Sequence, residues 1–165
     1  MYLTNLISSL GLKGALAGEV SFLVVFLLAS FALSFALGKH RILVSLLGVY
    51  VAYAILNLAD FDFLKDPQMK TLLFLAVLVS FVMLFSPVIR GRISGSGPSY
   101  FLKVTVGTAI VIGFSLSIIL GWYSAKETAS LILPDVREYF VSGIYKFLWV
   151  AAPVAYLGVV RRRID

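Results

Sequence analysis

The chain has 165 residues, of which 61% are hydrophobic and only 13% are charged, and its net charge is +6 at neutral pH. Soluble proteins carry about 25% charged residues, and a soluble fold of this size buries only about 70% of the surface of its unfolded chain. The composition therefore excludes an ordinary soluble domain and predicts a membrane protein. The absence of cysteine excludes disulfides, thiol catalysis and thiolate metal sites.

The first eighteen residues precede the first long apolar run. Four apolar residues within them recur at helical spacing: Leu3, Leu6, Ile7 and Leu10. We expect residues 1–18 to form an interfacial segment on the outer leaflet. The apolar run that follows is longer than the roughly 7 to 15 residues of a cleavable signal peptide, so it predicts a membrane anchor.

Five stretches contain almost no charge and are long enough for a helix to cross the hydrocarbon core, which takes roughly 20 residues. They are residues 20–38, 42–59, 71–89, 104–125 and 139–160. The pattern predicts an all-α fold: a polytopic transmembrane helix bundle of five spans, forming a single integral membrane domain over residues 1–165. The alternative is four spans plus a carboxyl-terminal amphipathic interfacial helix. That helix would carry one apolar face, made of Val136, Tyr139, Phe140, Ile144, Phe147 and Leu148.

The charges between the spans indicate an orientation. With five spans, one side of the membrane holds eight basic residues and one acidic residue, and the other holds six basic and seven acidic residues. Basic residues near span ends are retained in the cytoplasm. We therefore expect a bacterial-type cytoplasmic (inner) membrane location, with the amino terminus outside and the carboxyl terminus cytoplasmic. Basic residues expected to contact anionic lipid headgroups are Arg90, Arg92, Lys103, Arg161, Arg162 and Arg163.

Small residues recur within several spans, often at four-residue spacing, and would let a second helix approach closely. The predicted helix-packing residues are Ser30, Ser34, Gly38, Gly48, Ala52, Ala109, Gly113, Ser117 and Gly121. Such stripes serve either the internal bundle or an oligomer, and the sequence leaves both open.

Lys146 is the one residue charged at neutral pH inside a predicted span. Keeping a charge there costs about 3 kcal/mol, which makes the residue a candidate functional site. In one interpretation it pairs with Glu19 or Asp60 at the outer ends of neighbouring spans. In the other, its long stem reaches back to the outer headgroups over about 10 Å of helix.

Patterns typical of catalysis or metal binding are missing. His40 is the only histidine, and no second histidine or cysteine completes a transition-metal site or a Ser–His dyad. Asp60, Asp62 and Asp66 lack the acidic spacing and the glycine of an EF-hand. We therefore expect that the protein is not an enzyme and has no catalytic residue, cofactor or metal.

The order of features from about Thr71 to Trp149 is distinctive. A span is followed by a basic stretch, by the linker Gly95-Ser96-Gly97, by a span with Gly107 and Gly113, by Trp122, and by a Leu133-Pro134 break before an amphipathic aromatic helix. This order resembles the colicin V production (CvpA) family of small bacterial inner-membrane proteins. The resemblance implies an envelope- or secretion-associated protein without established catalytic residues, and it favours a carboxyl-terminal helix that does not span.

Two functional hypotheses follow. The first is a noncatalytic scaffold or subunit of an envelope- or secretion-associated complex that acts through helix packing. The second is an oligomeric channel or transporter subunit with a pore between copies, because one chain has too few polar residues to line a water-filled path. The expected partners are a bilayer with anionic headgroups and other membrane proteins or further copies of the chain. Nucleic acid is not expected, since no binding motif is present.

Overall fold

The computed structural model describes residues 14–88, 98–129 and 132–161, in which all regular structure is helical and no strand occurs. The expected all-α class is therefore confirmed. The elements are α2 (Gly14–Leu58), the 3-10 helix η1 (Asp62–Lys65), α3 (Pro67–Phe85), α4 (Pro98–Trp122), α5 (Ala125–Thr128), α6 (Pro134–Val141) and α7 (Gly143–Arg161). The expected interfacial segment 1–18 lies largely outside the described residues.

Five helical windows are long and apolar enough to cross a membrane, which agrees with the five expected spans. They are Gly18–Phe35, Arg41–Leu58, Pro67–Phe85, Tyr100–Trp122 and Gly143–Val160. The protein is thus a membrane-embedded helix bundle. The first two windows both belong to α2, and we call them the first arm and the second arm of that helix.

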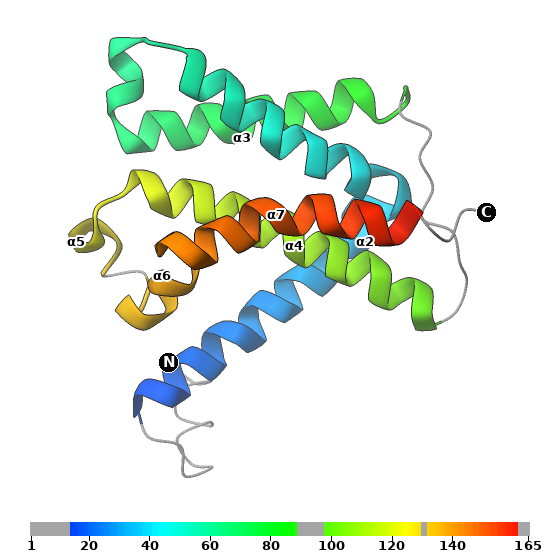
Figure 1. The fold of residues 1–165 in the computed structure, drawn as a ribbon, viewed down its shortest axis with the longest axis horizontal. Coiled ribbons are helices and arrows are strands. Elements are labelled where there is room, and N and C mark those ends of the chain that lie inside the picture. Colours follow the sequence, from blue (N-terminus) through cyan, green and yellow to red (C-terminus); the bar gives the residue numbers. More distant parts are fainter. Residues whose placement is uncertain (1–13, 89–97, 130–131, 162–165) are drawn as a thin grey trace.

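The two arms of α2 run in opposite directions (Figure 1). At the carboxyl end of the first arm, the ring of Phe35 lies 6.2 Å from that of Phe101, near the start of α4. Near its amino end, the ring of Phe22 lies 5.9 Å from that of Phe140, beyond the end of α4. The second arm then returns along α4. The sequence predicted two separate runs here, and the chain does reverse its direction between them, with the backbone helical across residues 36–40.

Local capping explains where several helices begin. Pro67 occupies the first turn of α3, and the carboxylate of Asp66 accepts a hydrogen bond from the Gln68 amide at 3.0 Å. At α5, Ser124 and Glu127 form a capping box. The hydrogen bonds from Ser124 hold the pKa of the Glu127 carboxyl below its ordinary value. These caps start α3 four residues earlier than the apolar run predicted.

The last apolar run contains a helix break that the sequence analysis missed. Helix α6 ends at Val141, Ser142 adopts an extended conformation, and α7 begins at Gly143. The prediction of one helix from residue 139 is therefore wrong, and so is the single apolar face proposed across the break. Val136 and Phe140 are buried, whereas Ile144, Phe147 and Leu148 are exposed apolar residues of α7.

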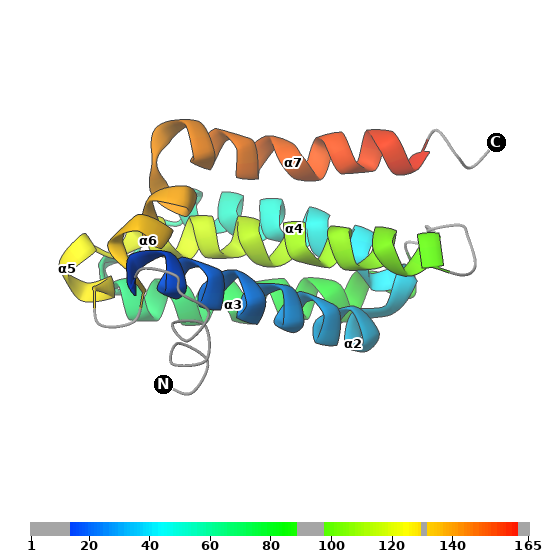
Figure 2. The same cartoon turned by 90° about the horizontal axis from the view of Figure 1, so that it is seen from below.

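The centre of the bundle consists of the second arm and α4. Buried residues make up 44% of the second-arm window and 50% of the α4 window, but only 6% of the α3 window and 11% of both the first-arm and α7 windows. Figure 2 shows α7 as a separate layer lying over α4. The main core cluster joins Leu46, Val49 and Leu56 of the second arm to Val111 and Phe114 of α4.

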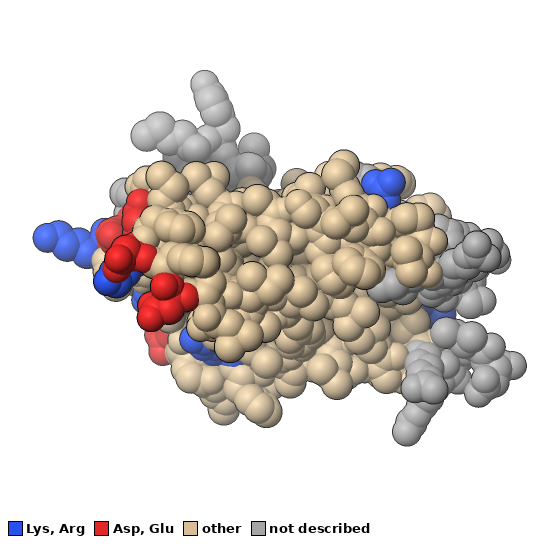
Figure 3. All heavy atoms as spheres, turned by 90° about the horizontal axis from the view of Figure 1, so that it is seen from above, with Lys and Arg blue, Asp and Glu red and all other residues tan. Residues whose placement is uncertain are grey.

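On the face drawn in Figure 3, charged side chains gather at the two ends of the bundle, and the surface between them carries no charge. We call one end the acidic end, because it carries every carboxylate among the described side chains. These lie in segments that meet at one end of the bundle in Figure 1, namely the start of the first arm, the connection from α2 to α3, α5 and α6, and they are Glu19, Asp60, Asp62, Asp66, Glu127, Asp135 and Glu138. We call the opposite end the basic end, defined by Arg41 and Lys103. This segregation is what a bundle crossing a bilayer requires, since charge is costly in the hydrocarbon region.

Candidate functional site

The small-residue stripe of α4 contacts both α6 and α7. A Cβ at Gly113 would lie 2.0 Å from Cζ3 of Trp149, so the missing side chain forms the notch that holds this ring. One turn further on, the buried hydroxyl of Ser117 donates a hydrogen bond of 2.6 Å to the Phe140 carbonyl. These two predicted packing residues are therefore used inside the chain.

The ends of the same stripe contribute less. Ala109 is half-buried, and Gly121 is exposed, with only Nζ of Lys146 3.7 Å from where its Cβ would lie. Gly107, which only the family resemblance singled out, has a tighter contact: a Cβ there would lie 2.6 Å from the Tyr156 hydroxyl. That hydroxyl donates to the Lys103 carbonyl at 2.9 Å.

The small residues of α2 behave in three ways. Gly48 packs against α3, where a Cβ would come within 2.9 Å of Leu78 and 3.0 Å of Phe81. Ala52 is fully buried in the central core. Buried Ser30 and Ser34 turn their hydroxyls back to carbonyls of their own helix, at 2.7 and 2.6 Å. Gly38 belongs to the α2 backbone, but its surroundings lie outside the described side chains.

An aromatic cluster connects the first arm to α6 and α7. Phe140 and Trp149 stack with ring centroids 5.4 Å apart, and Phe22 and Phe26 approach the same pair from the first arm. The indole of Trp149 donates to the Tyr139 carbonyl at 2.9 Å. The carbonyls of Tyr139 and Phe140 lie in the last turn of α6, where intrahelical donors are missing. Trp149 and Ser117 supply those donors, which stabilises the break before α7.

Arg137 joins α6 to the end of α4. Its Nη2 donates to the Tyr123 carbonyl at 2.9 Å and lies 3.5 Å from the Leu120 carbonyl. A cation is favoured at the carboxyl end of a helix, where carbonyls lack donors. On the sequence alone Arg137 is one charge among several on its side of the membrane, because nothing in the sequence places it beside Tyr123, the residue that follows α4.

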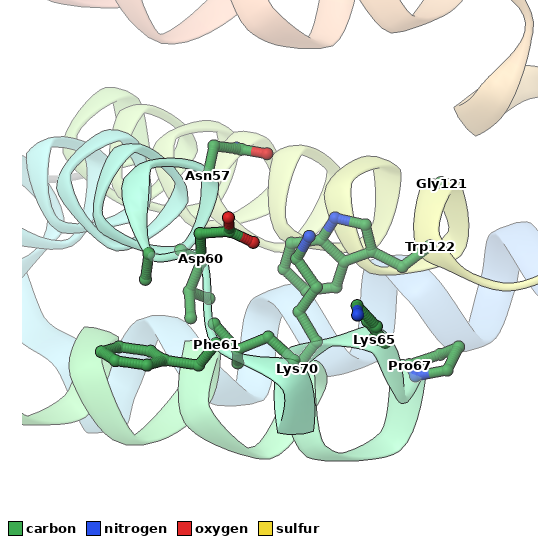
Figure 4. Close-up of a pocket in the computed structure, with 11 residues that line it drawn as sticks. Asn57, Asp60, Phe61, Lys65, Pro67, Lys70, Gly121 and Trp122 are labelled. Carbon is green, nitrogen blue, oxygen red and sulfur yellow. The ribbon is translucent and has the colours of Figure 1, made fainter.

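A polar pocket of about 560 Å³ opens at the acidic end, between the end of α2, the start of α3 and the end of α4. Its polar lining comes from α2, η1, α3 and α4 and from Asp60 after α2, and its apolar lining includes the buried residues Leu56 and Leu64. Figure 4 shows the carboxylate of Asp60 extending into the space that Lys70 and Trp122 border from the other side. The Lys70 ammonium lies 5.1 Å from the centroid of the Trp122 ring, a cation–π contact.

The polar groups of this pocket, which we call the acidic-end pocket, are incompletely paired. Lys65 is paired with Asp62, Nζ to Oδ1 at 2.6 Å. Asn57 donates through Nδ2 to the Tyr53 carbonyl of its own helix at 2.8 Å. Within the described part of the chain, the Asp60 carboxylate and the Lys70 ammonium have no hydrogen-bond or ion-pair partner. Nothing in the sequence groups Asp60 with Lys70 and Trp122, which themselves lie 52 residues apart.

Lys146 occupies a different environment from the one its sequence position predicted. Because α7 begins at Gly143, Lys146 lies in the first turn of that helix and its side chain is exposed at the acidic end. No carboxylate among the described side chains lies within 4.0 Å of its Nζ, so neither Glu19 nor Asp60 forms the expected ion pair. The interpretation in which the side chain reaches the headgroup region stays a prediction.

Most of the basic residues expected to contact anionic lipid lie outside the described part of the chain. Arg90, Arg92, Arg162 and Arg163 lie outside the described residues, and the side chain of Arg161 is likewise not described. Lys103 is half-buried at the basic end of α4. Arg41, at the same end, is exposed and lines a pocket of about 470 Å³ with Ser86 and Pro87.

Among the described residues, no group of three or more histidine, cysteine or acidic side chains is arranged to hold a metal ion. No protein-family model, curated protein or solved structure matches the chain. The resemblance to the colicin V production family stays a prediction, and so does the expected absence of a cofactor.

Proposed function

We propose that this protein is a noncatalytic membrane-embedded subunit that binds other membrane proteins laterally, through helix packing, in an envelope- or secretion-associated complex. The observation that carries the proposal is the exposure of α3, only 6% of which is buried within the chain. Leu72, Val79 and Met83, spaced at helical intervals, leave 62%, 54% and 75% of their surface exposed. This surface is available to a neighbouring helix.

The shape of this surface supports a protein partner. A groove of about 390 Å³ runs between α3 and the second arm of α2, and its apolar lining includes Ile55, Ala76 and Phe81. Apolarity does not by itself drive helices together in a bilayer, because lipid tails are equally apolar. A partner helix that packs closely into this groove does gain van der Waals attraction, so we place the docking position of the partner in the groove.

We also propose that the acidic end faces outward and the basic end inward across a bacterial-type cytoplasmic membrane, because positive charge is retained on the cytoplasmic side. The chain has no cysteine, so single cysteines report topology directly. Lys126→Cys at the acidic end should react with a membrane-impermeant maleimide in intact cells. Val88→Cys, after α3 at the basic end, should react only after permeabilisation. The reverse pattern would contradict this orientation.

Site-specific photocrosslinking tests the lateral contact. A photoreactive residue at Val79 of α3 should give a discrete adduct with another membrane protein, whereas one at Val154, an exposed position of α7, should give only lipid adducts. Filling the groove with Ala76→Trp should abolish the Val79 adduct, while the control Val154→Trp should not. Lipid adducts alone at Val79 would overturn the proposal. Crosslinked identical copies that conduct ions in liposomes would support the oligomeric channel instead.

A further inference from the structure

The acidic-end pocket has an acceptor side and a donor side. The acceptor side comes from the end of α2, with the Asp60 carboxylate and Oδ1 of Asn57, whose amide nitrogen is already bonded to its own helix. The donor side comes from α3 and α4, with the Lys70 ammonium and the indole N–H of Trp122 (Figure 4). Among the described residues, none of these four groups has a hydrogen-bond partner across the pocket.

The charges across the pocket limit the chemistry of a ligand. Asp60 would repel a simple anion, and Lys70 would repel a simple cation. A molecule with a cationic donor at one end and an anionic acceptor at the other satisfies both sides. Since a carboxylate and an amide oxygen both accept hydrogen bonds, a primary ammonium suits this side better than a quaternary ammonium, which has no N–H group.

The position of the pocket indicates where such a ligand resides. Three apolar windows begin or end beside it: one ends at Leu58, between the lining residues Asn57 and Ala59, and the others begin at Pro67 and end at Trp122. A tryptophan at the end of an apolar window is typical of the level of the lipid headgroups. The pocket therefore lies where phospholipid headgroups are concentrated.

We propose that the acidic-end pocket binds a phosphoethanolamine group, with its phosphate at Lys70 and Trp122 and its ammonium at Asp60 and Asn57. The group can belong to a membrane phospholipid or to the free zwitterion. This inference is independent of the lateral partner proposed above, because it concerns another surface and another ligand class.

Binding of three lipids to the delipidated protein in mild detergent, measured by native mass spectrometry, tests the proposal. We expect phosphatidylethanolamine to bind roughly tenfold more tightly than phosphatidylcholine or phosphatidylglycerol, a ratio that corresponds to about 1.4 kcal/mol. This comparison needs no variant. Equal binding of the three lipids would overturn the proposal.

Variants separate the two sides of the pocket. Asp60→Asn should remove the preference for the ethanolamine lipid. Lys70→Gln should instead weaken the binding of all three lipids to the same extent, since all three carry a phosphate. Glu138→Gln, an exposed carboxylate at the same end but outside the pocket, is the matched control and should bind as the wild type does. Retention of the preference in Asp60→Asn would contradict the assignment.

Competition with free phosphoethanolamine identifies the source of the group. Displacement of the bound lipid would indicate that the headgroup alone is recognised, and the free zwitterion is then a ligand as well. Lipid binding that resists the free zwitterion would assign the pocket to membrane phospholipid. Both outcomes support the shared chemistry, because each presupposes the selectivity for ethanolamine.

Discussion

The helices at the centre of the bundle, α4 and the second arm of α2, are similar in hydrophobicity to the peripheral helix α7. They differ from it in the way they contact their neighbours. All of these helices are apolar enough to cross a membrane. The centre uses residues without large side chains, such as Gly113 and Gly48, as notches for neighbouring rings and chains. In α7, by contrast, a Cβ at Gly143 or Gly158 would meet nothing within 4 Å. In a bilayer, contact geometry rather than apolarity therefore distinguishes the interior from the lipid-facing surface.

The largest expected effect is a loss of stability when glycine is replaced by alanine at a central position, compared with the same replacement at a peripheral position. Gly113→Ala places a methyl group against the Trp149 ring, which is held by Phe26 and Phe140 and cannot simply rotate away. We expect a loss of about 2–3 kcal/mol in the free energy of unfolding, measured by reversible denaturation in mixed micelles.

Gly158→Ala is the control for this exchange and should keep wild-type stability. The second variant Trp149→Phe removes the ring atoms that the new methyl would meet, so its combination with Gly113→Ala should be less destabilised than the sum of the two single changes. Simple additivity would show that the notch is not where the strain arises.

The joint between the centre and the periphery depends on Arg137. Arg137→Gln removes the cation from the carboxyl end of α4, and hydrogen bonds to charged groups contribute about 1.5–3 kcal/mol. Because this side chain is partly exposed, we expect a loss near the lower limit, about 1.5 kcal/mol, together with faster hydrogen exchange in α6. Lys126→Gln, at an exposed position of α5, should change neither quantity.

The smallest expected change in unfolding free energy concerns two serines of α4, one with a hydrogen-bond partner and one without such a partner in the described part of the chain. Ser117→Ala removes the hydrogen bond to the Phe140 carbonyl, and such bonds in membrane proteins contribute about 0.6 kcal/mol on average. The buried hydroxyl of Ser115 has no hydrogen-bond partner among the described residues, so Ser115→Ala should leave the unfolding free energy unchanged or slightly raised. Both are measured by the same denaturation. Equal losses at the two positions would contradict the role assigned to Ser117.

Much of the candidate packing surface could be predicted from the sequence, but the helices that contact this surface could not. The four-residue spacing of Gly113 and Ser117 correctly placed both on one face of a helix. Whether that face meets the same chain or another copy depends on how α6 and α7 return, which is a matter of loop geometry. Gly113 and Ser117 make their contacts inside the chain, and the partner surface that we propose therefore lies on the exposed face of α3 and not on the α4 stripe.

The break at Ser142 illustrates a limit of periodicity. Residues 139–160 form an apolar run with a single charge, and such a run is compatible with one continuous helix. The interruption is stable because Ser117 and Trp149 donate hydrogen bonds to the last carbonyls of α6. Neither donor can be assigned to those carbonyls from the local sequence. The position of Lys146 changed with the break, from the interior of a predicted span to the first turn of α7.

The amino-acid sequence by itself determined the helical class, the five apolar segments and the separation of charge between two ends, because these follow from composition and from the length needed to cross a bilayer. The tertiary structure alone decided which small residues act as notches, where the last run breaks, and that Asp60, Lys70 and Trp122 surround one pocket. These features depend on the rotation and register of helices far apart in the chain. Because apolar residues face the lipid as well as the protein interior, the sequence pattern does not distinguish the two sides of a helix.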